Sequence, residues 1–161
     1  MRSVNAKNST VSIRRVSSQA ELVQAFTIRI QVFVKEQRVP AEIELDSDDQ
    51  RAIHFLATKS AKALGTARVV MCHGNAKIGR MAVLKTFRRK GIGAVLLKRA
   101  VAAAKRLYAR RIYLHAQVAV IGFYQRLGFR AVGRVFDEAG IAHRKMVLEG
   151  KLTTKSTRGA K

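Results

Sequence analysis

The segment "FRRKGIGAVLLKRAVAAAKRL", residues 87 to 107, joins a basic turn to a long stretch with apolar residues at helical spacing. Gly91 and Gly93 stand where a predicted strand and a short loop lead into a predicted helix. Free backbone N–H groups and the positive end of the helix dipole meet at such a point, and glycine lets an anion approach the backbone. The segment therefore predicts an anion-binding helix start.

These two glycines do not identify the anion by themselves. The third glycine of the dinucleotide fingerprint is missing, and no ribose-binding acid follows at the expected distance. The Gly-Lys-Ser/Thr of a nucleoside triphosphate P-loop is also missing. A glycine-rich turn beside a basic helix start, without any ligand, is the plain alternative. If a phosphate binds here, we expect it to belong to a ligand that is bound by neither of these two motifs.

The rest of the chain alternates between strand and helix patterns. Ser18 is a predicted N-cap with Glu21 at capping-box spacing, and the helix after it ends before Arg38. A second helix runs to Leu107 and a third spans residues 118–128, while residues 38–49 are a predicted loop. Strands are predicted at residues 11–16, 52–59, 64–71, 76–84, 110–117, 129–136 and 143–150. The order predicts an α/β chain with a mixed sheet.

The predicted helix after the glycines has one apolar face. Its members are Ile92, Val95, Leu96, Ala100, Ala103, Ala104 and Leu107.

The net charge of +22 on 161 residues makes nucleic acid a candidate partner. Between Gln50 and Phe136 there are 19 lysines and arginines and no acid, while six acids lie between Glu36 and Asp49. A basic nucleic-acid-binding or ribosome-associated protein is therefore one hypothesis. However, aromatic residues make up only 6% of the chain and tryptophan is absent, so the sequence has no obvious strip for stacking bases.

The single cysteine, Cys72, excludes an internal disulfide and is typical of a reducing compartment. It ends an apolar run and has no partner for a metal site, so we expect a buried hydrophobic residue and no metal. No apolar run is long enough to cross a membrane. We expect a cytoplasmic protein, although the basic N-terminus resembles an organelle signal. The predicted organisation is a disordered start at residues 1–10, one domain at 11–149 and a disordered basic tail at 150–161.

Two motifs give the chain a family resemblance. "MAVLKTFRRKGIGAVLL", residues 81–97, resembles the acyl-CoA-binding motif of the GCN5-related N-acetyltransferases (GNAT), through Arg88, Gly91 and Gly93. "IGFYQRLGF", residues 121–129, looks like the second signature of that family. "RIQVFVKEQRVPAEIELDSDDQRAIHFLA", "LHAQ" and "AGIAHRKM" are similar to its ElaA-like branch, so the resemblance extends from Val11 to Glu149.

The resemblance implies a fold and a cofactor site. The fold would be a single α/β domain with a mostly antiparallel sheet, splayed between the fourth and fifth strands and flanked by helices. Acetyl-CoA would bind in the gap as the acetyl donor, with its pantetheine along the backbone of Met81, Ala82 and Val83. Its pyrophosphate would lie at Arg88, Arg89, Lys90, Gly91, Ile92, Gly93 and Ala94. Gln117 stands where many relatives carry an Asn that contacts the pantetheine.

The resemblance also implies direct acetyl transfer to an amine. Tyr124 would protonate the departing thiolate, and Glu36 is the first candidate for the base that deprotonates the amine. Glu42 and Glu44 are weaker candidates for that base, and His115, on the fifth strand beside the acceptor gap, could relay protons.

For the other acids and histidines, the sequence leaves both a functional and a structural role open. The acids from Glu42 to Asp49 either line the acceptor entrance or form a solvated loop, and His54 and His143 have structural or substrate-positioning roles. A small amine and a peptide amine both stay open as acceptors, and a homodimer is compatible with the family. A module that binds CoA without turnover is a third hypothesis.

Overall fold

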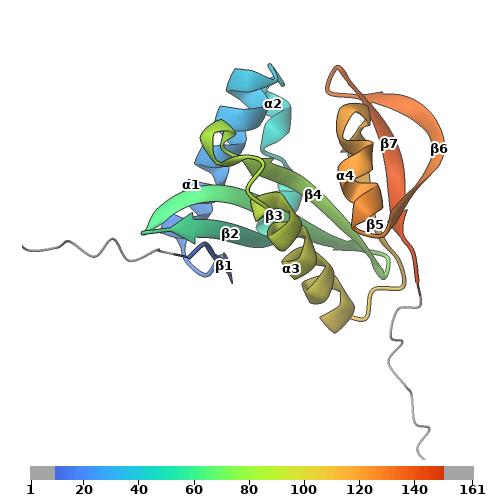
Figure 1. Ribbon diagram of the computed structural model, residues 1–161, viewed down its shortest axis with the longest axis horizontal. Helices are drawn as coiled ribbons and strands as arrows, with labels where there is room; N and C mark the ends of the chain where they lie inside the picture. Colours follow the sequence, from blue (N-terminus) through green and yellow to red (C-terminus); the bar gives the residue numbers. More distant parts are fainter. Residues whose placement is uncertain (1–9, 151–161) are drawn as a thin grey trace, which may run out of the picture.

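A single mixed sheet organises residues 10–150, the part of the chain that the computed structural model describes (Figure 1). Its spatial order is β1-β2-β3-β4-β5-β7-β6, and every neighbouring pair is antiparallel except β4 and β5. The strands are β1 Ser12–Arg15, β2 Ile53–Lys59, β3 Lys62–Cys72, β4 Asn75–Val83, β5 Ile112–Gln117, β6 Phe129–Glu138 and β7 Ile141–Leu148. This confirms the predicted α/β architecture and its mostly antiparallel sheet.

The sheet splays between β4 and β5, as the resemblance implied. The two strands pair at only three positions, the last of which joins Ile78 to Leu114. Beyond that pair β4 continues to Val83 and β5 to Gln117, and the two strands separate. The diverging ends form a V that opens toward the start of the long helix.

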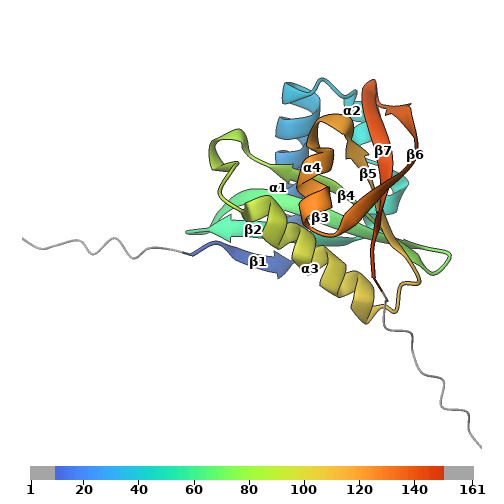
Figure 2. The same ribbon diagram turned by 45° about the vertical axis from the view of Figure 1, so that its right-hand side comes forward.

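Helices cover the two faces of the sheet (Figure 2). They are α1 Gln19–Arg29, the π-helix Ile30–Glu36, α2 Ala41–Glu44, α3 Ile92–Arg106 and α4 Ile121–Arg126, with short 3₁₀ turns at Ser47–Gln50, Lys85–Phe87 and Val118–Val120. The predicted N-cap is confirmed, because the Ser18 hydroxyl oxygen accepts a hydrogen bond from the Glu21 N–H at 3.2 Å.

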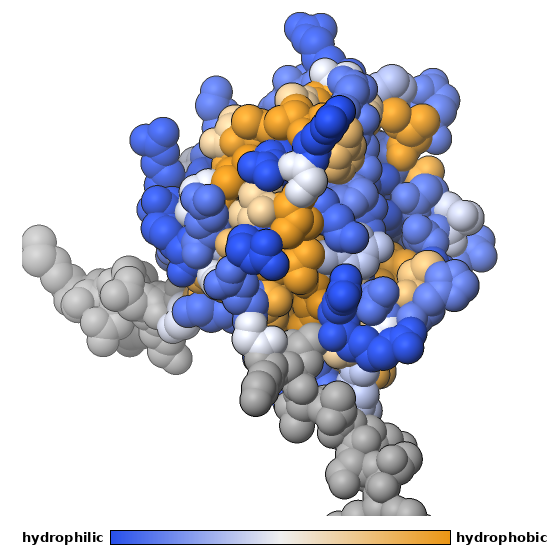
Figure 3. All heavy atoms as spheres, turned by 90° about the vertical axis from the view of Figure 1, so that its right-hand side faces the viewer, coloured by the Kyte–Doolittle hydropathy of each residue, from blue (hydrophilic) through white to orange (hydrophobic). Residues whose placement is uncertain are grey.

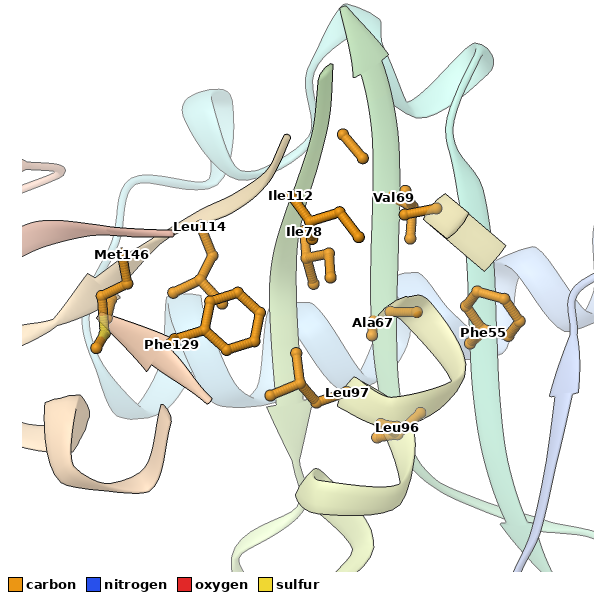
Figure 4. Close-up of a cluster of buried hydrophobic side chains, with 14 of the residues drawn as sticks. Phe55, Ala67, Val69, Ile78, Leu96, Leu97, Ile112, Leu114, Phe129 and Met146 are labelled. Carbon is orange, nitrogen blue, oxygen red and sulfur yellow. The ribbon is translucent and has the colours of Figure 1, made fainter. Parts of the chain in front are cut away.

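The main core lies between the sheet and α3 (Figure 4). The buried residues of α3 are Ile92, Leu96, Leu97, Ala100 and Ala104, which face the apolar side of β2, β3, β4 and β5. Val95 and Leu107 were predicted on this face but are 46% and 47% exposed. The buried stripe follows i, i+4 spacing from Ile92, and Val95 and Leu107 lie beyond its edge.

Three further predictions were wrong in detail. The predicted first helix changes at Ile30 into a π-helix, whose end is marked by the bond from the Gln37 N–H to the Val32 carbonyl at 3.1 Å. The predicted loop contains α2 and a 3₁₀ turn, which Pro40 and an Asp46–Asp49 capping box begin. Cys72 is exposed because β3 ends there in a hairpin turn.

The predictions for the chain ends concern residues 1–9 and 151–161, which lie outside the described residues. Within residues 10–150, no helix combines the length and the apolar character that crossing a membrane requires.

Candidate active site

A cleft of about 910 Å³ passes through the V between β4 and β5. One end lies at the start of α3 and the other at the turn between β6 and β7, with the π-helix and α2 along one side. A separation of two strands alone would be filled by side chains, so the cleft volume is the evidence for room to hold a ligand.

A β-bulge shapes the β4 wall of this cleft. Thr66 of β3 pairs with Ala82, but Arg68 pairs with Gly79, so β4 carries one extra residue between these pairs. Arg80 adopts a left-handed φ of 48° in the bulge. Its guanidinium turns toward α2 and donates to the Glu44 carbonyl at 3.2 Å. The bulge turns the Arg80 side chain toward α2 at the side wall of the cleft and leaves the backbone of the next residues along the gap.

The start of α3 has the features of an anion cradle. Gly91 is its N-cap with φ 80°, no side chain caps the first turn, and that turn contains no acid. Arg89 also has a positive φ, of 62°. A Cβ at Gly93 would lie 3.4 Å from the Phe123 ring, so a larger side chain would crowd this wall. The unpartnered N–H groups, the helix dipole and the nearby cations together favour a phosphate.

Arg88 ties the cradle to the rest of the cleft. Its Nε donates to the Val83 carbonyl at 2.8 Å, and its Nη2 donates to Glu36 at 2.9 Å. Glu36, the first candidate for the base, therefore lies in an ion pair at the end of the π-helix. The pair joins three elements that surround the gap.

Tyr124 lies on α4 with its hydroxyl 3.9 Å from the Met81 sulfur, which belongs to the β4 wall. Burial raises the pKa of Tyr124 to about 12, so the phenol keeps its proton at neutral pH. Its ring meets the Phe123 ring edge-on, with centroids 5.0 Å apart. A protonated donor held beside the gap is what the predicted role of Tyr124 requires.

Gln117 ends β5 on the other side of the V. Its side-chain amide donates to the Gln37 side-chain oxygen at 2.7 Å, so the two amides link β5 to the end of the π-helix. The predicted pantetheine contact stays a prediction, and the structure supplies the partner that orients Gln117.

Most of the acidic cluster forms a buried ion-pair network. Arg29 is fully buried and bonds Glu44 at 2.9 Å and Asp49 at 2.7 Å. Arg68 bonds Asp49 at 2.8 Å and Asp46 at 2.6 Å. Glu44 and Asp48 line the cleft, in keeping with the first interpretation, but guanidinium groups pair with Glu44, Asp46 and Asp49 internally.

The network leaves clear marks on the pKa values of its carboxyls. Burial raises the pKa of Glu44. Burial also acts to raise that of Asp49, but hydrogen bonds led by Arg29 outweigh it and lower the pKa of Asp49 to about 2.

A second cluster lines the cleft on the β5, β6 and β7 side. His115 Nδ1 lies 3.2 Å from Glu138 Oε1, and His143 Nε2 lies 3.6 Å from Glu138 Oε2. Phe136 packs edge-on against the His115 ring and stacks against the His143 ring. Sequence reasoning placed both histidines on strands but missed Glu138, whose only signal was an acid beside the turn "DEAG".

The structure brings most of the predicted site residues together. The cleft is lined by Met81, Ala82, Val83, Arg88, Arg89, Gly91, Ile92, Gly93, Ala94, Gln117 and Tyr124. Lys90 and Glu36 lie beside it, with the Lys90 ammonium over the Phe87 ring at 5.7 Å. Among the described residues, no three histidine, cysteine, aspartate or glutamate side chains are grouped as metal ligands would be.

Comparison with known proteins finds relatives along nearly the whole chain. A family model described as "Acetyltransferase (GNAT) domain" matches residues 13–150. The uncharacterized N-acetyltransferase YjcF of Bacillus subtilis (strain 168) is 35% identical over 148 residues, which cover 91% of this chain and 99% of YjcF. Protein ElaA of Escherichia coli (strain K12) is 30% identical over 138 residues, which cover 82% of this chain and 90% of ElaA.

Solved structures share the fold. The crystal structure of Escherichia coli ElaA matches with a TM-score of 0.78 and 27% identity, over 87% of this chain and 100% of that one. A GNAT family acetyltransferase from Elizabethkingia anophelis, solved with acetyl-CoA bound, matches with a TM-score of 0.63. It is 18% identical and covers 85% of this chain and 94% of that one, so it shows the fold alone.

Proposed function

Because the chain belongs to the GNAT acetyltransferase family, in its ElaA-like branch, we propose that it moves an acetyl group from acetyl-CoA directly to a primary amine. The observation that carries the proposal is the cleft through the V of β4 and β5, which ends at the uncapped glycine turn of α3. One face of the cleft offers a site for a phosphate-bearing donor, and the other is open to an acceptor.

The residues present fit acetyl-CoA. The cradle from Arg88 to Ala94 would hold its pyrophosphate, and the β4 backbone from Met81 to Val83 would hold its pantetheine. When bound, acetyl-CoA supplies the activated acetyl thioester. The relative from Elizabethkingia anophelis, which has acetyl-CoA bound, supports this assignment through its shared fold.

Tyr124 would hold the proton that the sulfur needs. Its phenol is protonated at neutral pH, as an ordinary tyrosine is, and burial raises its pKa further, to about 12. It lies beside Met81, one of the residues proposed to hold the pantetheine. A thiolate is a fairly good leaving group, so the contribution of Tyr124 should be moderate.

The acceptor must lose a proton before it reacts. At an ordinary pKa of about 10.4, only about one lysine-like amine in a few thousand is neutral at pH 7. The acceptor would be a small amine or a peptide amine, and the cleft offers it a base.

Calorimetric titration with acetyl-CoA, at about 0.1 M and about 0.5 M salt, tests the cradle. We expect one site per chain, tight binding at both salt concentrations, and loss of binding in Gly91→Glu. Gly122→Glu is the matched control, because Gly122 is exposed on α4, lies outside the cleft and has open space around it. Equal binding by the two variants would contradict the proposed cradle.

A polyanion partner is the second candidate. A hollow of about 510 Å³ on the β6–β7 side carries Arg110, Arg111, Arg130 and Lys145. Seen from the side where β6 and β7 lie, however, a band of hydrophobic residues interrupts the hydrophilic surface (Figure 3). Weak multi-site binding of RNA that disappears between the two salt concentrations would indicate indiscriminate attraction, whereas binding that persists would support a dedicated site.

A further inference from the structure

We propose that His115, oriented by Glu138, takes the proton from the acceptor amine in a slot beside Gly79. The inference rests on the proposed acetyl transfer and names the base of that reaction. Acceptors of this site would be primary amines that arrive as ammonium ions. The proposal follows from the position of His115 in the V, from the space beside it and from the carboxylate that holds it.

His115 occupies the point where the sheet splits. It is the first residue of β5 after the last pair with β4, which joins Ile78 to Leu114. Along β5 the buried residues Ile112, Leu114 and Ala116 alternate with half-buried ones, and His115 belongs to the half-buried set. The buried set packs in the core below α3 and α4, so the imidazole lies on the opposite face, where the cleft opens.

Gly79 leaves space on the face of the sheet that carries this imidazole. It is the next residue of β4 after Ile78, and it therefore lies across the split from His115 on the same face. A Cβ built at Gly79 would meet no heavy atom within 4 Å, and its φ lies outside the left-handed region. The glycine is thus not required by the backbone conformation, and its missing side chain leaves a slot in the cleft wall.

Glu138 determines which nitrogen of His115 is free to accept a proton. Hydrogen bonding from His115, ahead of opposing burial, lowers the pKa of Glu138 to about 2, so its carboxylate is ionised and can only accept. His115 must therefore donate its Nδ1–H to Oε1, at 3.2 Å, which leaves Nε2 as the acceptor. The arrangement is that of a carboxylate holding an imidazole base.

The charges around His115 come from every element that packs against it. The positive charges of Lys77 on β4 and Lys145 on β7 disfavour the imidazolium form of His115. The negative charge of Glu138 on β6 favours it. His143 of β7 faces the other oxygen of Glu138 and donates its own Nδ1–H to the Ile141 carbonyl at 2.7 Å. The Tyr113 ring of β5 lies tilted against the His115 ring, with centroids 6.0 Å apart. Glu138 is thus the carboxylate that balances an imidazolium at this point.

The proton balance closes with groups already described. The ammonium gives one proton to His115 Nε2, and the neutral nitrogen then forms the new C–N bond. The C–S bond breaks as the sulfur takes the electron pair. Tyr124 gives its proton to the sulfur and regains one as the nitrogen releases its second proton through water, while the first proton leaves His115 for solvent.

Kinetics with acetyl-CoA and three primary amines (2-phenylethylamine, spermidine and lysine amide) test the base. With the best of these amines, His115→Gln should lower kcat by about 100-fold, a typical effect of losing a general base. Its affinity for acetyl-CoA should stay within about twofold, since His115 lies away from the cradle. His73→Gln, at an exposed turn, is the matched control with no expected effect. Gly79→Val should raise the KM of the amine and leave acetyl-CoA affinity unchanged.

The pH profile separates a base from a merely structural residue. In Glu138→Gln the acidic limb of kcat/KM should move to lower pH, because an imidazolium without its carboxylate gives up its proton more readily. An unchanged limb, with normal acetyl-CoA binding and measurable turnover, would overturn the inference and leave the proposed function intact. Failure of the wild type to bind acetyl-CoA would instead overturn the proposed function.

Imidazole ¹⁵N NMR gives an answer without any acceptor. His115 should carry its proton on Nδ1 when neutral, and its titration should move to lower pH in Glu138→Gln. A neutral His115 protonated on Nε2, or a titration that ignores Glu138→Gln, would also overturn the inference.

Discussion

Replacing Arg29 by methionine should destabilise the fold by about 3 kcal/mol, the low end of the range for breaking a buried ion pair by removing one partner. Arg29 is fully buried, and its guanidinium makes hydrogen bonds to the Glu44 and Asp49 carboxylates and to the Glu44 carbonyl. Methionine replaces the arginine side chain as far as the Nε position, so the apolar part of the packing is largely kept and the main loss is electrostatic.

The low end of the range applies because the carboxylates of Asp49 and Glu44 keep other partners when Arg29 is removed. Asp49 keeps Arg68 at 2.8 Å and the Asp46 N–H at 3.0 Å. Within the part of the chain that the structure describes, Glu44 then keeps only the ion pair with Arg80, at 3.3 Å, so Glu44 is the poorly compensated charge. Asp49 should tolerate the change, and most of the penalty should come from Glu44.

Urea unfolding followed by circular dichroism measures the effect. With a slope of about 2 kcal/mol per molar urea, about 3 kcal/mol corresponds to a midpoint shift of about 1.5 M. Arg130→Met is the matched control, because Arg130 pairs with Glu149 at 3.0 Å on the surface and exposed pairs contribute little. Its midpoint should not move measurably.

Lowering the pH tests the cause. Burial already raises the pKa of Glu44, and loss of Arg29 removes a contact that opposes this rise. The folded variant then binds a proton more readily than the unfolded chain, so its deficit against the wild type should shrink from pH 7 to pH 5. A deficit that grows over this interval, or a midpoint shift no larger than that of Arg130→Met, would refute the reasoning.

Three further outcomes are expected. The pKa of Asp49 is about 2 in the folded protein and about 3.9 in the unfolded chain, so its ionisation contributes on the order of 2 kcal/mol to the free energy of unfolding. This contribution is present above pH 4 and is lost as the pH falls toward 2. Thermal melts of Asp49→Asn should not show this loss of stability. Tyr124→Phe should lower kcat about 10-fold with unchanged acetyl-CoA affinity, measured by thiol release, and an unchanged kcat would remove Tyr124 as the proton donor. Gly93→Leu should weaken acetyl-CoA binding more than tenfold without unfolding the protein. A Cβ at this position would lie 3.4 Å from Phe123, so the rest of the leucine side chain must enter the cradle. An unchanged affinity in calorimetry would contradict this.

Local patterns in the sequence were sufficient for the strands, the longer helices and the cradle, but not for the π-helix or α2. Ser18 and Glu21 marked the start of α1, and Gly91 and Gly93 marked the start of α3, because caps and glycine turns depend on a few adjacent residues. Strand alternation located the strands for the same reason. The splay between β4 and β5 was implied by the family resemblance alone.

Only the tertiary structure revealed which charged residues contact one another. His115 and Glu138 are 23 residues apart in the sequence, and Arg29 and Asp49 are 20 apart, so no periodicity connects them. The bulge at Arg80 depends on how β3 and β4 pair, and an acid such as Glu44 looks like a solvated residue until a buried guanidinium is placed beside it. Short-range sterics and hydrogen bonding determine elements, whereas desolvation and ion pairing depend on which distant residues the packed sheet brings into contact.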